Sequence, residues 1–314
     1  MSRAGTPRVI VFGGSGYLGA AFVAETLRRG CSVVVCDLPG AQVPPAVEFR
    51  PVDIRDAEAV AAALEPDAYV VNFAGIADLN VARNQPRAVI ETNVIGNINL
   101  LEACRQTRVR KYCFASSAYV YSLHGSFYRI SKRTCEEYII EYQKRHSIDF
   151  IILRYGSLYG GHSSDTNGMH RIVKSALTQG TVKYGGEGAD SREFIHIDDA
   201  SAVSADLVLG EARNQAYLLT GAERITMQQL FDLLQEILDR PLKVELGGAS
   251  AESHYRMTQY NFAPIEARKV FPTEHVDIGN GLLRLIERIH AEQHGAPAGL
   301  PLESALDPER SNDS

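Results

Sequence analysis

The feature that most constrains this chain is a glycine-spaced segment close to its start. Residues 8–19 read RVIVFGGSGYLG, and the apolar run before the first glycine is typical of a strand buried on both faces of a parallel sheet. Gly13, Gly16 and Gly19 follow at three-residue spacing, and residues 17–27 carry apolar side chains at helical period. We expect these glycines to permit a tight turn, the approach of backbone to a diphosphate, and close packing of helix on strand. The segment predicts a phosphate-binding strand, turn and helix; an ordinary tight turn is the alternative.

A carboxylate stands where such a fold binds a ribose. Asp37 ends the next apolar run, 18 residues after Gly19, and an acid at this position accepts hydrogen bonds from the adenosine ribose. It also repels a 2′-phosphate, so we expect NAD rather than NADP. Arg50 and Arg55 lie near enough in sequence to keep NADP open.

Two further strands end in residues that suit a dinucleotide. Asp53 follows a short strand over residues 47–51, where it can reach the adenine amino group while Ile54 packs on the ring. The alternative is that Asp53 caps a helix over residues 56–64. The next strand, over 68–73, ends in NFAG, and these small residues would let the cofactor's ribose lie against backbone.

Composition limits the class of protein. The 314 residues, 45% hydrophobic and 22% charged, suffice for one large or two unequal domains. A net charge of −6 without a Lys/Arg stripe argues against nucleic acid as a partner. Five scattered cysteines without a CxxC pair indicate reduced thiols and no metal site. No apolar segment is long enough for a signal peptide or a membrane span, so we expect a cytoplasmic protein.

Strands and helices alternate along the first half of the chain. This order predicts an α/β fold, a doubly wound parallel-sheet (Rossmann) domain with its ligand at the carboxyl ends of the strands. The second half is less regular and predicts a smaller C-terminal substrate-binding α/β lid. We expect a dinucleotide-binding domain over 1–155 that also receives about 193–212, a substrate-binding domain over 156–192 and 213–290, and a disordered tail over 291–314.

Several local expectations bear on the site. The periodicity predicts one helix over 86–107, with Asn93 and Asn97 one turn apart, and a second helix over 128–145. We expect a loop over 156–168 and a single strand over 192–197. Asp198 and Asp199 should cap a helix over 200–209.

The chemistry candidates are a serine at the end of a strand and a tyrosine–lysine pair. Tyr128 and Lys132 are four residues apart at a helix start, so they share a face. The ammonium beside the phenol should lower a pKa that is normally about 10 and make Tyr128 a usable acid or base. Ser117 ends the preceding strand and can orient the same substrate oxygen. The alternative for the pair is an exposed helix surface.

An ordered series of motifs runs from the glycine segment to residue 200. It comprises GGSGYLG (13–19), Asp37, VDIRD (52–56), NFAG (72–75), TNVIGNINLLEA (92–103), SSAYVY (116–121), YRISK (128–132), LRYGSLYG (153–160) and DSREFIHIDDA (190–200). In this order the chain resembles the extended short-chain dehydrogenase/reductases, especially their nucleotide-sugar epimerase/dehydratase branch, over roughly residues 8–290.

The resemblance implies an NAD-dependent enzyme and assigns roles to residues. Ser117 would orient the substrate, Tyr128 would be the acid/base, and Lys132 would also bind the ribose. Arg192 and Arg256 would bind the substrate's diphosphate, with a salt bridge from Arg192 to Asp190 or Glu193 as the alternative. The cofactor-binding candidates are Gly13, Gly16, Tyr17, Leu18, Gly19, Asp37, Asp53, Ile54, Phe73, Ala74, Gly75, Asn93, Tyr128 and Lys132.

The chain departs from the family pattern at three places. Only six residues separate Tyr121 from Tyr128, where relatives carry a longer loop, so one wall of the sugar pocket is missing. Ser157 stands where relatives often have an asparagine that touches the diphosphate; we keep it as a substrate-binding candidate. Ser122 replaces a glycine.

The reaction we expect is epimerisation of a nucleoside-diphosphate sugar, in the first place a UDP-sugar, by transient oxidation at C4. Dehydratases of the family carry an Asp-Glu dipeptide where this chain has Ala118-Tyr119, and neither residue can supply the acid and base of dehydration. A net oxidoreductase such as an NDP-ketosugar reductase is the alternative, and a dinucleotide-sensing binding protein is a third hypothesis.

The resemblance and the apolar surface of the helix over 128–145 predict a homodimer through that helix and the helix over 86–107.

Overall fold

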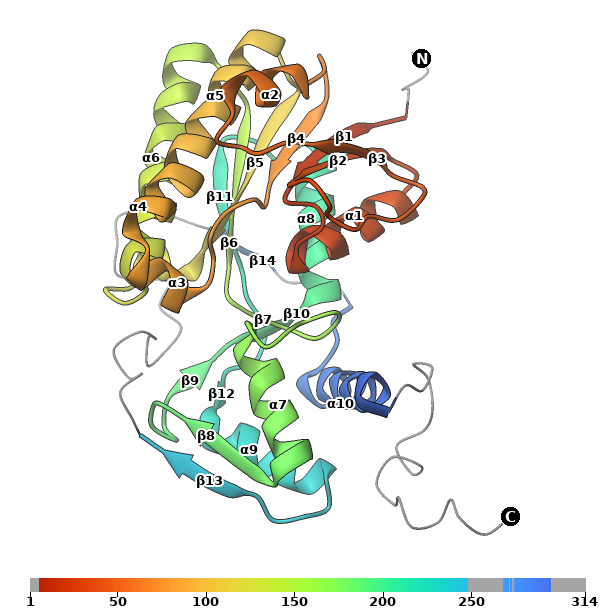
Figure 1. Ribbon diagram of the computed structural model, residues 1–314, viewed down its shortest axis with the longest axis vertical. Helices are drawn as coiled ribbons and strands as arrows, with labels where there is room; N and C mark the ends of the chain where they lie inside the picture. Colours follow the sequence, from red (N-terminus) through yellow and green to blue (C-terminus); the bar gives the residue numbers. More distant parts are fainter. Residues whose placement is uncertain (1–5, 248–267, 271, 273, 295–314) are drawn as a thin grey trace.

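An eight-stranded parallel sheet forms the core of the upper part of the protein as drawn in Figure 1. The computed structural model describes residues 6–247, 268–270, 272 and 274–294. The strands of the sheet are β1 (Arg8–Phe12), β2 (Ser32–Asp37), β3 (Glu48–Pro51), β4 (Tyr69–Asn72), β5 (Lys111–Ser117), β6 (Phe150–Tyr155), β11 (Gln215–Leu219) and β14 (Arg268–Val270). Their order is β14-β11-β6-β5-β4-β1-β2-β3, so the direction of travel across the sheet reverses between β1 and β4. A doubly wound sheet binds its ligand beyond the carboxyl ends of the strands at this point.

Alternate residues of each central strand enter two different cores. Val9 and Val11 pack on the face covered by α1 (Tyr17–Arg28) and α8 (Ile197–Leu209). Ile10 and Phe12 pack on the opposite face, which α2 (Ala57–Ala62), α5 (Gly96–Thr107) and α6 (Ser126–His146) cover. Burial on both faces is the reason these strands are continuous apolar runs in the sequence. The predicted doubly wound parallel sheet is confirmed.

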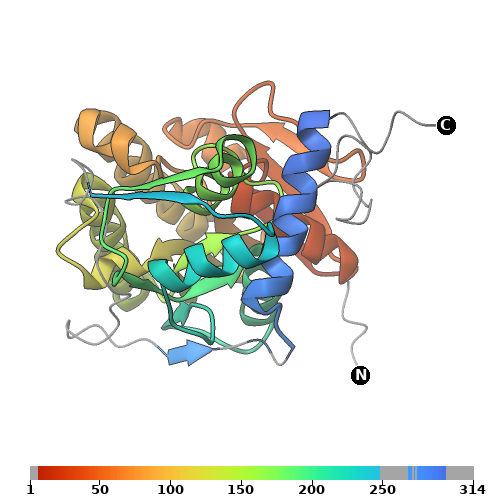
Figure 2. The same cartoon turned by 90° about the horizontal axis from the view of Figure 1, so that it is seen from below.

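A third core joins elements from the second half of the chain, in the lower part of Figure 1. Buried side chains of α7 (Gly168–Gln179), α9 (Met227–Ile237) and α10 (Ile278–His294) meet there. Figure 2 shows the same elements from below. Three small two-stranded sheets accompany them: β7 (Ser157–Tyr159) with β10 (Phe194–His196), β8 (Thr181–Tyr184) with β13 (Lys243–Leu246), and β9 (Ser191–Arg192) with β12 (Ile225–Thr226).

The helix expected over 86–107 is interrupted by a π-helical segment. The chain forms α3 (Leu79–Asn84), then α4 (Pro86–Val89), the π segment η1 (Ile90–Ile95) and α5. A π turn accommodates one additional residue, and such segments are frequent at functional sites. Asn93 lies within η1.

Other boundaries also differ from the expectations. Residues 157–159, expected as loop, form β7, because they pair in parallel with β10. The single strand expected over 192–197 is divided between β9 and β10, which pair with different strands. The N-cap of α8 is His196, so Asp198 and Asp199 lie in its first turn and do not cap it. Helix α10 continues to His294, past the start of the predicted tail.

None of the described helices is both long and apolar enough to cross a membrane. All five cysteines are buried and free.

Candidate active site

The glycine segment forms a tight turn between β1 and α1. Gly13 has φ +75°, and a Cβ there would lie 2.5 Å from the backbone N of Ala74. A Cβ at Gly19 would overlap the carbonyl of Gly13, so helix and turn approach as closely as backbone allows. The N-cap residue of α1 is Gly16, so no N-cap side chain competes with an anion for the first N–H groups of the helix. This geometry fits a dinucleotide diphosphate.

Asp37 lies at the end of β2 and is held against the glycine turn. Its Oδ2 accepts hydrogen bonds from the backbone N of Ser15 at 3.0 Å and from Ser15 Oγ at 2.5 Å. Its Oδ1 accepts from the N of Leu38 at 2.8 Å. These bonds fix the carboxylate beside the turn, in the position expected of a ribose ligand.

The two arginines that kept NADP open are both held in ion pairs. Arg50 Nη2 lies 2.6 Å from Glu48 and 2.5 Å from Glu65, and Arg55 Nη2 lies 2.5 Å from Asp53. Each pairing neutralises a charge that a 2′-phosphate would need, which favours NAD.

The alternative reading of Asp53 as a helix cap is wrong. Asp56 is the N-cap of α2, and its carboxylate accepts from the N–H groups of Glu58 and Ala59. Ile54 is buried and packs on Gly96, where a Cβ would lie 2.6 Å from its Cδ1.

Asn93 ties the segment after β4 to the helix α6. Its Oδ1 accepts from the N of Ile76 at 2.7 Å, and its Nδ2 donates to the Ile76 carbonyl and to Ser131 Oγ, each at 3.0 Å. Gly75 has φ +154°, and a Cβ there would lie 2.9 Å from Asn93 Oδ1. The segment after β4, where the sequence predicts that the cofactor's ribose lies against backbone, is therefore a compact turn held by the hydrogen bonds of Asn93 to Ile76.

The remaining cofactor candidates sit around the same turn. Phe73 packs on Phe22 with ring centroids 5.3 Å apart. Leu18 and Ala74 contact the two cores of the sheet. Tyr17 Oη donates to the carbonyl of Gly160 at 2.9 Å, and burial raises the pKa of this phenol.

Tyr128 and Lys132 lie together in the first turns of α6, next to β5, whose last residue is Ser117. Lys132 Nζ donates to the carbonyl of Ala115 at 2.8 Å, two residues before Ser117 on β5. It lies 5.8 Å from the centre of the Tyr128 ring, one helical turn away, and 4.7 Å from the ring of Phe114. The structure therefore places the ammonium beside the phenol as the sequence predicts.

Burial changes the acidity of the lysine. Lys132 is 5% exposed, and desolvation lowers its pKa from 10.5 to about 8, while nearby Glu136 opposes the change. A lysine with this pKa is still mostly charged at pH 7. It can therefore stabilise a developing phenolate on Tyr128.

A buried ion pair behind this site is absent from the sequence-based candidates. Arg154 and Glu136 have fully buried side chains and form a bidentate pair, with distances of 2.9 Å from Nε to Oε1 and 2.7 Å from Nη2 to Oε2. Ser116 Oγ donates to Glu136 at 2.5 Å, and Arg154 donates to Tyr121 Oη at 2.6 Å. The network locks α6, β5 and β6 together next to Ser117 and Lys132. An arginine inside an apolar strand, and a glutamate one turn after Lys132, are the sequence signals that could have identified it.

Of the three residues besides Ser117 that are predicted to bind the substrate, the structure describes Arg192 and Ser157. Arg192 is 7% exposed, and its guanidinium donates to the Ser191 carbonyl at 2.9 Å and to Tyr184 Oη at 3.1 Å. Tyr184 Oη also donates to Asp190 at 3.0 Å. Ser157 is partly buried at the start of β7. Arg256 lies outside the described residues.

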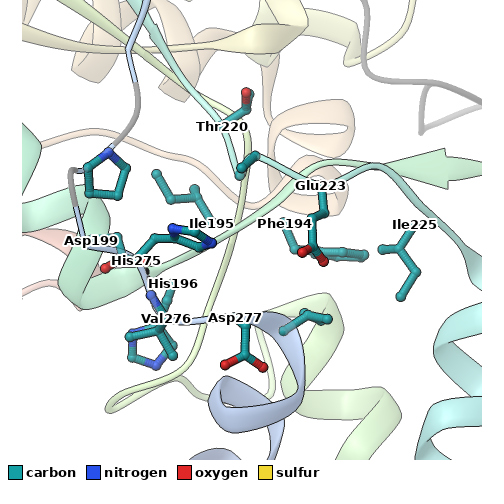
Figure 3. Close-up of a pocket in the computed structure, with 14 residues that line it drawn as sticks. Phe194, Ile195, His196, Asp199, Thr220, Glu223, Ile225, His275, Val276 and Asp277 are labelled. Atoms are coloured by element: carbon teal, nitrogen blue, oxygen red, sulfur yellow. Dashed lines mark hydrogen bonds between the residues drawn. The ribbon is translucent and has the colours of Figure 1, made fainter.

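A separate pocket lies where β10, the end of β11 and the start of α10 meet (Figure 3). His196, Asp199, Glu223 and Asp277 are among its lining residues. Ser117, Tyr128 and Lys132 do not line it, so it is distinct from the catalytic candidates.

The family of the chain follows from its sequence. Residues 9–216, more than half of the chain, match the NAD dependent epimerase/dehydratase family. The chain belongs to this family. Its cofactor is NAD, and the chain is an enzyme of the extended short-chain dehydrogenase/reductase type, as the motifs predict. When bound, NAD supplies a hydride acceptor and donor.

Individual relatives span most of the chain. A putative UDP-glucose 4-epimerase of Methanocaldococcus jannaschii is 27% identical over 76% of this chain and 87% of its own length. A dTDP-glucose 4,6-dehydratase of Streptomyces antibioticus is 28% identical over 72% of this chain and 76% of its own length. Among solved structures, the Thermus thermophilus UDP-glucose 4-epimerase in complex with NAD is 25% identical, with a TM-score of 0.68 over 95% of this chain and 96% of that one.

Proposed function

We propose that the protein is a nucleotide-sugar epimerase that oxidises a UDP-sugar transiently at C4 and returns the hydride to the opposite face. The observation that carries this proposal is the contact of Lys132 with the Tyr128 ring and with the carbonyl of Ala115, two residues before Ser117 at the end of β5. This end of β5 is on the same edge of the parallel sheet as the NAD turn. Relatives that carry the name UDP-glucose 4-epimerase support it.

Each catalytic side chain has one task in this reaction. Tyr128 takes the proton from the C4 hydroxyl as the C4 hydrogen leaves as hydride, and it returns the proton when the hydride comes back. Lys132 stabilises the phenolate form of Tyr128 through its charge. Ser117 donates a hydrogen bond to the same oxygen and holds it in place. Because hydride and proton both return, the product has the mass of the substrate.

Dehydration is disfavoured by what flanks Ser117. Relatives of both kinds, epimerases and dehydratases, match this chain at similar identity. Identity therefore does not distinguish the two reactions, and the residues of the site are the basis for choosing between them. Elimination of water needs an acid and a base beside the oxidised carbon. Ala118 has no titratable group, and the described carboxylate nearest in this network, Glu136, is committed to Arg154.

The UDP part of the substrate is proposed to bind near Arg192. This arginine is 7% exposed, and its guanidinium donates to Tyr184 Oη and to the carbonyl of Ser191 in its own strand. A planar guanidinium suits the bidentate recognition of a phosphate. Arg192→Met should therefore raise the KM for a UDP-sugar by tenfold or more while NAD binding stays intact.

The decisive experiment is product analysis with and without the Tyr128 hydroxyl. We expect the NAD-loaded protein to convert a UDP-sugar to an epimer of unchanged mass, without stoichiometric NADH, and Tyr128→Phe to lose this activity by a factor of at least 10². Tyr142→Phe is the matched control and should keep full activity, because this phenol lies farther along the same helix and donates to Glu102 at 2.5 Å.

Other products would overturn the proposal in distinguishable ways. A loss of water from the product would indicate dehydration, and a change of two hydrogens would indicate the net oxidoreductase. NAD binding without turnover of any nucleotide sugar would favour the dinucleotide-sensing protein.

We further propose that the enzyme works as a homodimer through the outer faces of η1 and α6. Large apolar side chains there are between 40% and 54% exposed, far more than the sheet-facing residues of the same helices: Ile90, Ile95, Phe127, Ile130 and Tyr138. A cluster of this kind favours burial against a second copy.

A further inference from the structure

Tyr119 contacts two of the three catalytic residues. Ser117 is the N-cap of the 3₁₀ turn η2 (Ala118–Tyr121), and the backbone N of Tyr119 donates to Ser117 Oγ at 3.3 Å. The Tyr119 ring packs edge-to-face on the ring of Tyr128, with centroids 6.2 Å apart and an interplanar angle of 80°. The same residue thus borders both groups that hold the reacting oxygen.

The ring of Tyr119 also contacts the connection that precedes α6. Gly125, in the short connection between η2 and α6, has φ +95°, and a Cβ there would lie 2.6 Å from Cδ1 of Tyr119. Only glycine combines this backbone angle with so close an approach. The connection therefore closes on the ring and restricts its movement away from Tyr128.

These contacts define a wall beside the substrate carbon. A substrate whose oxygen bonds both Ser117 Oγ and Tyr128 Oη would therefore lie next to Tyr119. An aromatic side chain that packs against both Tyr128 and Gly125 is bulky and has little freedom to move aside for a substituent. The ring carbons bonded to C4 of a nucleotide sugar are C3 and C5. Of these, C5 carries either hydrogen, as in a pentose, or an exocyclic carbon, as in a hexose.

We propose that Tyr119 determines substrate specificity by leaving little room for an exocyclic carbon on C5, so that the enzyme prefers a UDP-pentose to the corresponding UDP-hexose. This inference rests on the proposed epimerase function. One additional carbon group in a close-fitting pocket changes kcat/KM by about 10- to 200-fold.

The test uses two substrates that differ only in this group. UDP-xylose is UDP-glucose without the C6 hydroxymethyl, and epimer formation from each is followed by chromatography with NAD-loaded enzyme. We expect the wild type to favour UDP-xylose by tenfold or more in kcat/KM. Tyr119→Ala should lower this ratio at least tenfold, mainly through a gain with UDP-glucose, whereas Tyr119→Phe, which keeps the ring, should preserve it.

Two further variants distinguish the loss of the Tyr119 ring from a general disturbance of the site. Leu123→Ala changes a 90% exposed residue of the same connection and should leave the ratio as in the wild type. Tyr119→Thr replaces Tyr119→Ala if the alanine variant does not fold, and the same fall in the ratio is expected.

Two results would overturn the inference alone: a wild-type preference for UDP-glucose, or equal ratios in the wild type and the small variants. Turnover of no UDP-sugar by the wild type would overturn the proposed function as well.

Discussion

Replacing Lys132 by methionine should stabilise the NAD-free protein while it abolishes turnover. The ammonium is 5% exposed, and its pKa is lowered from 10.5 to about 8 because burial disfavours the charged form. Methionine fills a similar volume without a charge, so it removes the cost of burying the ammonium. The loss of activity follows because the variant has no cation beside Tyr128.

The magnitude follows from the change in acidity. Each unit of pKa corresponds to about 1.4 kcal/mol, so a pKa lowered from 10.5 to about 8 means that keeping Lys132 charged in the folded protein at pH 7 costs about 3 kcal/mol. The lost hydrogen bond to the Ala115 carbonyl offsets about 1 kcal/mol of the gain. We therefore expect Lys132→Met to raise the free energy of unfolding by about 2 kcal/mol at pH 7.

The pH dependence gives the sharper test. Between pH 8 and 10.5 the unfolded chain binds a proton at Lys132 that the folded chain does not, so this residue makes wild-type stability rise with pH in that window. The advantage of the variant should be complete below pH 8 and nearly gone at pH 10. Urea unfolding followed by circular dichroism measures it, because the chain has no tryptophan for fluorescence.

Lys111→Met is the matched control and should have the opposite sign. Lys111 is also buried, but its Nζ donates to the carbonyls of Val208 at 3.0 Å and Gly210 at 2.8 Å, at the end of α8. Burial lowers the pKa of Lys111 as well, so methionine again removes a cost of burying charge. The net change should still be a loss of about 2 kcal/mol, because two carbonyls lose their donor and the helix dipole loses a cation. A Lys132→Met variant that is less stable than the wild type at pH 7, or an advantage that does not change up to pH 10, would refute the reasoning.

Three more outcomes test other parts of the structure. Glu136→Gln leaves Arg154 uncompensated in a dry site and should cost about 3–5 kcal/mol in urea unfolding; an unchanged midpoint would contradict the role given to the pair. Asp37→Ala should weaken NAD binding at least tenfold in calorimetry, and equal affinity would remove the ribose contact from the proposal. Ile130→Glu should convert a dimer to a monomer in light scattering, and a wild-type monomer at micromolar concentration would exclude the dimer itself.

The sheet and the NAD turn could be predicted because their residues are dictated locally. Gly13 must adopt a positive φ next to the backbone of Ala74, and Asp37 ends a strand whose apolar run is unmistakable. The pairing of Tyr128 with Lys132 follows from helical spacing alone. Such features depend on residues close together in the sequence and not on contacts with distant segments of the chain.

What could not be predicted depends on contacts between distant segments. The strands β7, β9 and β10 have three residues or fewer and exist through their pairing partners. Arg154 and Glu136 are 18 residues apart, and nothing in the periodicity says that they meet. An α turn and a π turn differ by one residue, which the apolar pattern of residues 86–107 does not resolve.

The π segment η1 has a consequence for the phase of the helix that contains it. Each residue of an α-helix turns the chain by about 100°, so one extra residue sets α4 and α5 out of phase by that angle. Within one continuous helical segment, Asn93 can therefore contact Ile76 and Ser131 while the apolar residues of α5 still face the sheet. A single-residue deletion within residues 90–95 would remove the extra residue of the π turn. With α5 still packed on the sheet, every side chain before the deletion would rotate by about 100° around the helix axis, away from its present partner.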